Sequence, residues 1–298
     1  MIEQDVSFKN YPTFMQVATA CVFWMVHLTC FFVLWVGVSW IAVLICLALY
    51  GIRMFAITGG YHRYFSHRSF QTSRSFQFVL ALLGCTSAQK GPIWWASHHR
   101  HHHKYSDTEY DVHSPKISGL YYAHMGWVLS KQYKHTETAL VQDLTKFPEL
   151  QFLGHLYMLP PILLATATYY LGVGLDNTFP ALQTSGPQML VWGFFVSTVL
   201  LYHGTFCINS FTHLIGRQRF HTGDDSCNHW LLALITLGEG WHNNHHRYPG
   251  SERQGMYWWE IDITHYGLVA LSKLGIVWDL RSYPQIIYAE AASNRLAS

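Results

Sequence analysis

The sequence is poor in charged side chains, and this shortage limits the class of protein first. Only 12% of its 298 residues are Asp, Glu, Lys or Arg and half are hydrophobic, whereas soluble domains carry about 25% charged residues. The formal net charge is only +2, so the balance of charges indicates no nucleic-acid partner. This composition favours a lipid bilayer as the surroundings of much of the chain.

Cysteine motifs and nucleotide-binding motifs are also missing. The six cysteines are scattered, mostly within apolar runs, and none forms a CxxC pair. We therefore expect buried thiols in a reducing compartment, and neither a disulfide framework nor a thiolate metal site. The sequence has no GxGxxG and no CxxCH haem-attachment motif. The acidic N-terminus and the long apolar run that follows argue against a cleaved signal peptide.

Runs without charge predict the membrane topology. Phe14 to Ile52 contains no charged residue over 39 positions, and a single helix of that length would measure about 58 Å, close to two crossings of a core about 30 Å thick. This run predicts a hairpin that turns near Val36 and Gly37. A second apolar pair is interrupted by the polar stretch 173–187. We predict four spans, at about residues 14–36, 38–58, 151–172 and 188–209.

Basic residues predict the orientation, because cytoplasmic loops are enriched in Lys and Arg. Segment 60–150 holds ten of the 19 basic residues and segment 210–298 holds seven, and Lys9 and Arg53 fall on the same side. We expect one domain over residues 1–298, an all-α integral membrane protein with four transmembrane helices. A cytoplasmic helical cap would carry the histidines, and both termini would be cytoplasmic. The bacterial inner membrane is a better match than the endoplasmic reticulum.

Two shorter apolar stretches, Ser75 to Gln89 and Trp230 to Leu237, are too brief to cross a bilayer. We expect them to form helices at the membrane interface or packed under the cap. The alternative for the whole chain is a large soluble enzyme, in which the apolar runs would be buried helices.

Histidine carries the chemical information. The 20 histidines include dense groups in GGYHRYFSH, ASHHRHHHKYSD and GEGWHNNHHRYP. The pattern HxxHH occurs in two of them, although chance predicts it about 0.1 times in a chain of this composition. Helix positions i, i+3 and i+4 share one face, so His242, His245 and His246 can meet at one centre. His62 and His67 lie about 140° apart on a regular helix, so they converge only if the helix ends or kinks.

The middle group fits HxxHH in two registers. His99, His102 and His103 form one, and His98, His101 and His102 form the other. Spacing alone does not choose between them.

The number of histidines predicts two metal ions. Imidazole suits Zn, Fe, Cu or Ni, and no carboxylate recurs at the spacing of a carboxylate-bridged di-iron bundle. Eight histidines are too many for one ion. The alternatives are surface histidines or a metal-storage tract, but interleaved Trp, Gly and Tyr residues are not typical of such low-complexity tracts.

These segments resemble the three histidine boxes of membrane fatty acyl desaturases, in particular bacterial enzymes similar to stearoyl-CoA desaturase. The family pattern W-x-x-x-H-R-x-H-H-K matches Trp95 to Lys104, which implies the register of His99 and leaves His98 and His101 beside the ligands or at the surface. NSFTH resembles the family's N-S-x-x-H, which implies a ligand at His213 and a metal-bound water held by Asn209. The implied histidine ligands are His62, His67, His99, His102, His103, His213, His242, His245 and His246.

The resemblance implies an O2-dependent di-iron oxidoreductase that introduces a cis double bond, at C9 (delta-9), into a saturated fatty acyl-CoA. An acyl-lipid substrate is the alternative, as is a hydroxylase or an alkene-forming decarboxylase on the same scaffold. Zinc lacks the required redox chemistry. No catalytic group beyond the metal ligands is expected. Electrons would come from a separate ferredoxin, rubredoxin, or cytochrome b5 with its reductase. A membrane metal-binding or transport protein is disfavoured because the spans contain few ionisable residues.

Substrate contacts are also predicted. Gln89 and Trp95 match positions that shape the bend of the acyl tunnel in the family, and Tyr202 matches a tunnel-lining aromatic. Tyr50 lies about 18 Å before His62 along a helix and should help to close the tunnel. The predicted contacts to a phosphorylated head group such as coenzyme A are Lys90, Arg100 and Lys104. The alternative is that these cations bind anionic lipid head groups, as cytoplasmic Lys and Arg often do. Carboxylates that could orient ligand imidazoles are Asp107, Asp111 and Glu239.

Overall fold

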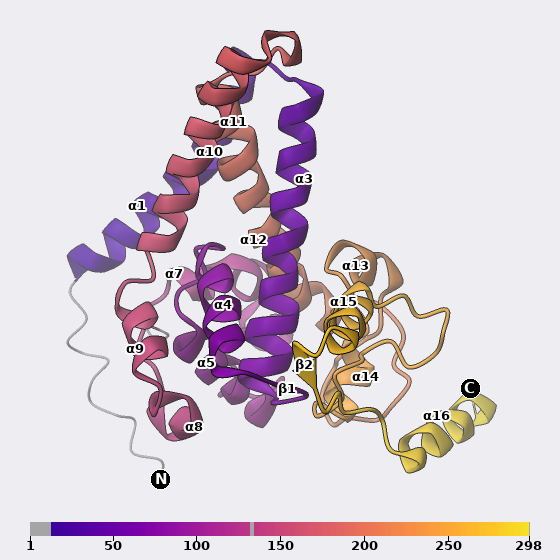
Figure 1. Ribbon diagram of the computed structural model, residues 1–298. Helices are drawn as coiled ribbons and strands as arrows, with labels where there is room; N and C mark the ends of the chain where they lie inside the picture. The colour runs from indigo at the N-terminus through magenta and orange to yellow at the C-terminus, as the bar shows by residue number, and fades with distance from the viewer. Residues whose placement is uncertain (1–12, 132–133, 298) are drawn as a thin grey trace.

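The computed structural model describes residues 13–131 and 134–297, which form a group of long apolar helices standing on a broad helical cap (Figure 1). Helices η3, η4 and η7 are π-helices, and η2, η5, η6 and η8 are 3-10 helices. The elements before the cap's central helices are α1 (Thr13–Thr29), η2 (Cys30–Phe32), α2 (Val33–Val36), α3 (Trp40–Phe55), η3 (Ala56–Ser66), β1 (Gln71–Thr72) and α4 (Arg74–Cys85).

The remaining elements alternate between the cap and the apolar helices. The middle of the chain forms α5 (Pro92–Tyr105), α6 (Pro115–Ser118), η4 (Tyr122–Gly126), α7 (Trp127–Leu129), η5 (Thr138–Val141), α8 (Gln142–Thr145), α9 (Pro148–His155), α10 (Leu159–Thr178) and η6 (Pro180–Leu182). The last part forms α11 (Gly186–Met189), η7 (Leu190–Val196), α12 (Ser197–Ser210), η8 (Phe211–His213), α13 (Trp230–Ile235), α14 (His242–Arg247), α15 (Ile263–Lys273), β2 (Val277–Trp278) and α16 (Gln285–Ala297).

Three continuous helices are long and apolar enough to cross a bilayer, namely 16–36, 40–66 and 186–213. A fourth crossing requires α9 and α10 to count as one span, although they meet at a bend of 68°. The predicted third span, 151–172, therefore runs across this bend. Pro160 and Pro161 stand in the first turn of α10, where proline lacks an amide donor and disfavours a helical residue before it. The apolar helix consequently starts at Leu159 and runs on to Thr178.

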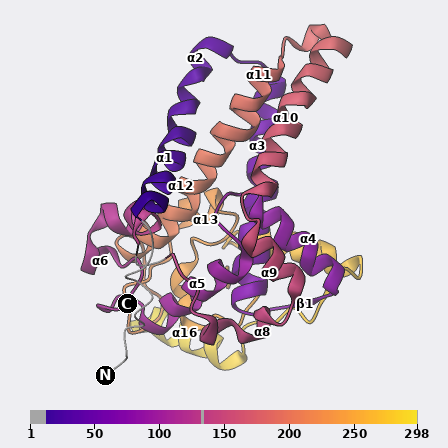
Figure 2. The ribbon, with the colours of Figure 1, turned by 90° about the vertical axis from the view of Figure 1, so that its left-hand side faces the viewer.

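The first hairpin turns where the sequence predicts. Helix α2 ends at Val36, and Gly37 follows with φ of 68°, a left-handed conformation that glycine adopts without strain. Ser39 then caps α3, its Oγ accepting a hydrogen bond from the amide of Ala42. The same hydroxyl donates to Gln188 Oε1 at 2.6 Å, which joins the tops of the two helix pairs (Figure 2).

Arg53 is not a loop cation, contrary to its use in the orientation argument. It lies inside α3 and is 1% exposed. Its guanidinium donates to Ser197 Oγ, to Thr198 Oγ1 at 2.8 Å and to the carbonyl of Thr86 at 3.3 Å. Neutral oxygens thus hold this buried cation where α3, α12 and the end of α4 meet. Lys9 lies outside the described residues.

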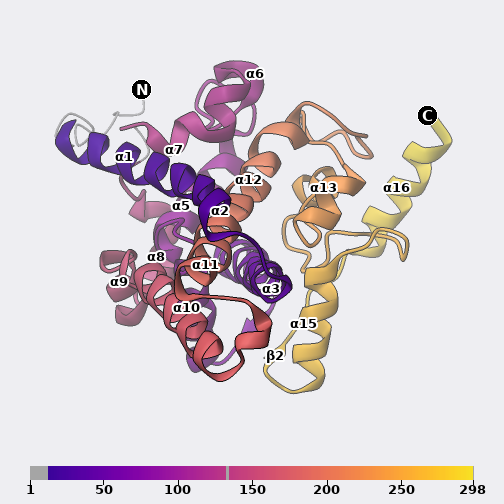
Figure 3. The same cartoon turned by 90° about the horizontal axis from the view of Figure 1, so that it is seen from above.

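The cap packs around the lower half of α3 and η3. Its core includes Tyr61, Phe65, Leu80 and Leu144, and a two-residue antiparallel ladder pairs β1 with β2. Apart from this ladder, the described regular structure is helical, as predicted. The short apolar stretches form α4 and α13, which are both below span length. Seen from above, α13 and α15 lie on the side of α3 that faces away from α1 (Figure 3).

Candidate di-metal centre

A π-helix brings the first two histidines together. All eleven residues of η3 are buried, and the amide of His67 donates to the carbonyl of His62 at 3.2 Å. This i to i+5 bond is the signature of a π-helix, and it places positions five apart over one another. The two ring centroids are consequently 4.9 Å apart. The kink that convergence requires is therefore a change of helix type.

Helices α5 and α14 supply histidines to both of two groups. The first histidine group consists of His62, His67, His99, His103 and His245, and the second consists of His102, His213, His242 and His246. Within each group the candidate ligand atoms lie within 4.8 Å of one another. The structure thus assembles the nine predicted histidines from η3, the loop after it, α5, η8 and α14.

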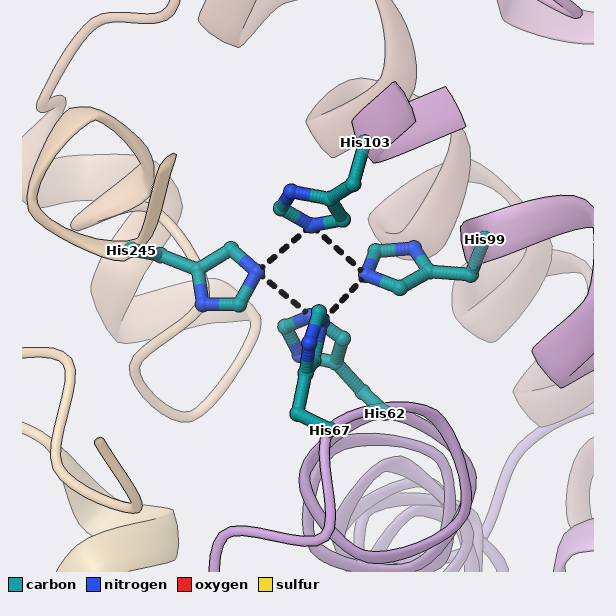
Figure 4. A group of neighbouring side chains, drawn as sticks. All are labelled: His62, His67, His99, His103 and His245. Atoms are coloured by element: carbon teal, nitrogen blue, oxygen red, sulfur yellow. Dashed lines mark hydrogen bonds between the residues drawn. The ribbon is translucent and has the colours of Figure 1, made fainter. Parts of the chain in front are cut away.

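In the first group the Nε2 atoms face one another in a ring (Figure 4). The distance between Nε2 atoms is 2.8 Å for His67 and His99, and 3.0 Å for His99 and His103. It is 2.9 Å for His103 and His245, and 3.0 Å for His245 and His62. These four contacts join five imidazoles, and a cation at their centre would be a common partner for all of them.

The alternative histidines of the middle box lie outside both groups. The ring of His98 bonds through Nδ1 to the carbonyl of Trp94 at 2.9 Å. His101 bonds to Glu137 Oε2 at 2.9 Å through Nδ1. Of the two registers that spacing leaves open, the structure brings together the one that contains His99 and His103.

Carboxylates fix the orientation of four of the grouped imidazoles. Asp111 accepts from His102 Nδ1 at 2.8 Å and Asp107 from His213 Nδ1 at 2.7 Å. Glu239 contacts His62 Nδ1 and is held in turn by Arg63, whose Nη2 is 2.9 Å from Glu239 Oε1. An Nδ1–H that donates to a carboxylate turns the Nε2 lone pair towards the group centre. These are the three carboxylates that the sequence singles out.

A fourth carboxylate, Asp224, escaped the sequence analysis. It accepts from His246 Nδ1 at 2.6 Å. Nothing in the sequence separates it from the neighbouring Asp225, whose side chain pairs with Lys116 instead. Only the fold of the loop after η8 determines which of the two reaches the histidine.

Burial sets the charges of the site. It lowers the pKa of His67, His99 and His103 well below the ordinary value, and neighbouring imidazoles add to this shift. Burial alone would raise the pKa of Asp107 and Glu239, but the hydrogen bond of His213 to Asp107, and the charges of His62 and Arg63 near Glu239, hold both pKa values at about 2. At neutral pH His67, His99 and His103 are therefore uncharged imidazoles, whereas the carboxylates of Asp107 and Glu239 are ionised.

The donor set fits two redox metal ions. Ligands at right angles, with bonds of about 2.1 Å, place their nitrogens about 3.0 Å apart, whereas a tetrahedral ion separates them by about 3.4 Å. The edges of 2.8–3.0 Å in the first group match the right-angled arrangement. In the second group, His102 Nε2 and His246 Nε2 are buried without a partner among the described residues. Right-angled imidazole ligands at the first group suit an ion of higher coordination than tetrahedral zinc.

Two cavities reach the histidines. The larger measures about 650 Å³ and the smaller about 30 Å³, and both are lined by Trp95, His99, Thr205 and Asn209. The smaller one also touches His62 of the first group and His102 and His242 of the second. Both groups therefore face the end of one apolar path.

The predicted bend residues lie on this path. Gln89 donates to Thr205 Oγ1 at 3.1 Å and accepts from the indole of Trp95 at 3.4 Å. Tyr202 lines the larger cavity, and its hydroxyl donates to the carbonyl of Ala88 at 3.1 Å.

Tyr50 does not line either cavity. Its hydroxyl donates to the carbonyl of Ile235 at 2.6 Å, and Met54, one helical turn closer to His62, lines the smaller cavity instead. A length measured along α3 gives the height of Tyr50, but it does not say which side chains line the cavity at that height.

Two of the three predicted head-group cations, Arg100 and Lys104, do not line either cavity. The guanidinium of Arg100 binds Asp143 and the carbonyls of Phe65, Ser66 and Leu140. Lys104 lies over the ring of Tyr105 and is not among the residues that line either cavity.

Lys90 alone of the three lines the larger cavity. Its Nζ lies 4.2 Å from the Trp94 ring centroid and donates to the carbonyl of Lys134 at 3.4 Å. His113, which the sequence analysis missed, also lines this cavity, and its ring lies 4.3 Å from that of His102.

Comparisons with known proteins agree with this geometry. The family model described as fatty acid desaturase matches residues 38–277. The chain is 37% identical over 252 residues to an acyl-CoA C20 delta5-desaturase of Anemone leveillei, covering 82% of this chain and 75% of that protein. It is 37% identical over 245 residues to an sn-1 stearoyl-lipid 9-desaturase of Anabaena variabilis, covering 82% of this chain and 85% of the relative.

A third relative is the chloroplastic palmitoyl-monogalactosyldiacylglycerol delta-7 desaturase of Arabidopsis thaliana. It is 35% identical over 263 residues, which cover 87% of this chain and 66% of the relative. The histidine groups, the apolar helices and the extent of these matches lead to one identification: the chain belongs to the fatty acid desaturase family and is an oxidoreductase of lipid metabolism.

Proposed function

We propose that the chain uses two iron ions and O2 to introduce a cis double bond at C9 of a saturated fatty acyl chain. The observation that carries the proposal is the small cavity between the two histidine groups, because it continues the larger apolar cavity. A C–H bond brought there would meet both metal positions and little else. Position 9 is the one named for two stearoyl-lipid desaturases among the relatives, whereas others are named for positions 5 and 7.

The two histidine groups would each hold one iron ion, with Asn209 placed to hold a water beside them. When bound and reduced, such a pair supplies the one-electron and O2 chemistry that breaks unactivated C–H bonds. The protein's own contribution is to orient the imidazole ligands and to exclude water from the reacting carbons. Asp107, Asp111 and Asp224 keep the Nδ1–H of three imidazoles hydrogen-bonded, so that Nε2 is free to coordinate.

The shape of the cavity would bend the acyl chain beside the histidine groups. Trp95 with Gln89 and Thr205 forms a rigid bonded wall where the larger cavity meets the smaller. An acyl chain that passes this wall must turn, and the turn would present one pair of adjacent carbons to the metals. Met54 would stop the methyl end. Apolar walls exclude water from the reacting carbons.

Two acyl carriers are candidates, coenzyme A and a membrane glycerolipid. The pairing of Arg100 with Asp143 leaves Lys90 as the one predicted head-group cation in the cavity wall, which weakens the case for a polyphosphate head. Met25 and Ile162 line the larger cavity and are 57% and 54% exposed on the apolar helices. Figure 2 places α1 and α10 on opposite sides of α12. An opening between α1 and α10 would admit an acyl chain from the bilayer, which favours the glycerolipid.

The apolar helices would cross the membrane four times, with the cap in the cytoplasm of a bacterial cell. That arrangement faces the metal groups towards soluble electron carriers, and a ferredoxin, a rubredoxin, or cytochrome b5 with its reductase would supply the electrons.

The test is to reconstitute the iron-loaded chain in lipid nanodiscs with a reduced ferredoxin. One arm receives stearoyl-CoA, and the other receives nanodiscs made of distearoyl lipid. We expect an O2-dependent cis-9 monoenoic product, and most of it in the lipid arm. A hydroxylated acid or a shortened terminal alkene would contradict desaturation, whereas product in the CoA arm alone would contradict only the glycerolipid carrier.

A further inference from the structure

Two lysines, Lys90 and Lys134, line the larger cavity. Lys90 belongs to the loop between α4 and α5, and Lys134 follows α7. Each part-buried ammonium donates to a carbonyl oxygen: Lys90 Nζ to that of Lys134 at 3.4 Å, and Lys134 Nζ to that of Val128 at 2.7 Å. Among the described residues that line this cavity, none is an Asp or a Glu. The cavity wall therefore presents two cations and no carboxylate from the described part of the chain.

The backbone around Lys90 is held in an unusual conformation. Ala88 and Lys90 are both left-handed, with φ of 56° and 64°, and such strain in residues with side chains concentrates at functional sites. The hydroxyl of Tyr202 donates to the carbonyl of Ala88 at 3.1 Å, and that of Tyr61 donates to the carbonyl of Lys90 at 3.0 Å. The Lys90 ammonium lies 4.2 Å from the centroid of the Trp94 ring. This loop thus fixes Lys90 in the cavity wall with neutral groups beside its charge.

The two ammonium groups are unfavourable in this wall without an anion. Burial lowers the pKa of Lys90 to about 7, with a smaller contribution from the charge of Lys134, and burial lowers the pKa of Lys134 to about 8. A negatively charged ligand beside them would favour both ionised forms. Each ammonium has three N–H donors and uses one in the carbonyl bond described above, so donors remain for such a ligand.

The position of Lys134 indicates the head-group layer of a bilayer. The first candidate span starts at Gln16, whose side-chain amide donates to the carbonyl of Leu129 at 3.3 Å. Leu129 is the neighbour of Val128, the residue to which Lys134 is bonded. Lys134 therefore lies beside the end of a candidate span, and Phe14, two residues before Gln16, lines the same cavity. The phosphate groups of phospholipids lie at this level, between the hydrocarbon core and water.

We propose that Lys90 and Lys134 bind the phosphate of a glycerophospholipid whose acyl chain occupies the larger cavity. This inference rests on the glycerolipid carrier of the proposed function, and it specifies an anionic head group. A phosphodiester carries a single negative charge, which two ammonium groups can neutralise and bind by charge-assisted hydrogen bonds. Coenzyme A carries several phosphates, and Arg100, another cation predicted to meet them, is paired with Asp143. A neutral sugar head would leave both ammonium groups without a counter-charge.

The test measures lipid binding to the full chain by native mass spectrometry, without an electron donor, so that no turnover occurs. The probes are distearoyl phosphatidylglycerol and distearoyl monogalactosyldiacylglycerol, which share their acyl chains and differ in the charge of the head group. We expect the phospholipid to bind at least ten times more tightly. Lys90→Met and Lys134→Met should each reduce this preference at least threefold. Lys104→Met is the matched control, because it removes a cation that lines neither cavity, and it should leave the preference unchanged.

Equal binding of the two lipids by the unaltered chain would overturn the proposal, as would a preference that persists unchanged in either Met variant. Coenzyme A is the third probe. If it displaces the phospholipid and loses affinity in the same two variants, the site binds the phosphates of coenzyme A and the lipid assignment is wrong. Because binding is measured without turnover, a failure to form a double bond would contradict the proposed function and not the phosphate site.

Discussion

The pairing of Asp224 with His246 offers a sharp prediction, because a neighbouring aspartate provides its control. Asp224→Asn keeps the volume of the side chain but removes the charge that the 2.6 Å contact to His246 Nδ1 depends on. Partners of this kind typically contribute a factor of 10–100 in metal affinity, or about 1.4–2.7 kcal/mol. We therefore expect iron at the second histidine group to bind about 10–100 times more weakly, while the first group is unaffected.

The assay is iron binding to the metal-free chain under anaerobic conditions, with Mössbauer spectra to distinguish the two sites. Asp225→Asn is the matched control, since its carboxylate pairs with Lys116 and makes no contact with a histidine. Unaltered affinity at the second group in Asp224→Asn would refute the reasoning. An equal loss of iron affinity at both histidine groups in both variants would also refute it. That result would mean that the two aspartates affect iron binding only through the stability of the fold.

Three further predictions follow from other contacts. Met54→Ala should lengthen the acyl chains that are accepted beyond the double bond, whereas Tyr50→Ala alone should not; gas chromatography of the products after feeding chains of different length decides between them, and equal profiles would contradict the assignment of Met54. Ser197→Ala leaves a buried donor of Arg53 without its acceptor and should destabilise the protein by about 1–3 kcal/mol in thermal unfolding, so an unchanged melting temperature would count against that network. Burial and the charge of Lys134 lower the pKa of Lys90 to about 7, so its ammonium costs stability below pH 7 and the cost fades towards pH 10. Lys90→Met should therefore stabilise the protein by up to about 5 kcal/mol at pH 6 and by about 1 kcal/mol at pH 10 in thermal unfolding, and a gain that grows with pH would contradict this expectation.

The long apolar helices could be predicted from the sequence because an absence of charge over 39 residues is a property of composition alone. The bend within the third predicted span could not be predicted, because a local steric effect produces it. Hydropathy treats Pro160 and Pro161 as part of an apolar run, but their rings end one helix and begin another. The turn at Gly37 was predictable because two crossings of a bilayer need a break near that point.

The histidine site was predictable to the extent that helix geometry applies. His242, His245 and His246 follow regular spacing, but His62 and His67 meet through a π-helix, which no spacing rule gave in advance. The register of the middle box rested on family resemblance until the fold separated His99 from His98. Asp224 and His113 could not be found at all, since long-range folding brings their loops to the rings.

The central claim is that two histidine-held iron ions desaturate an acyl chain in the cavity between them. The most direct measurement is a single turnover: the chain is loaded with iron, reduced, freed of donor, and exposed once to O2 with bound saturated substrate. Since a reduced iron pair holds two electrons and desaturation by one O2 consumes two, we predict one double bond for every two iron ions. No double bond from iron-loaded protein, or equal yields from protein loaded only with zinc, would contradict the account.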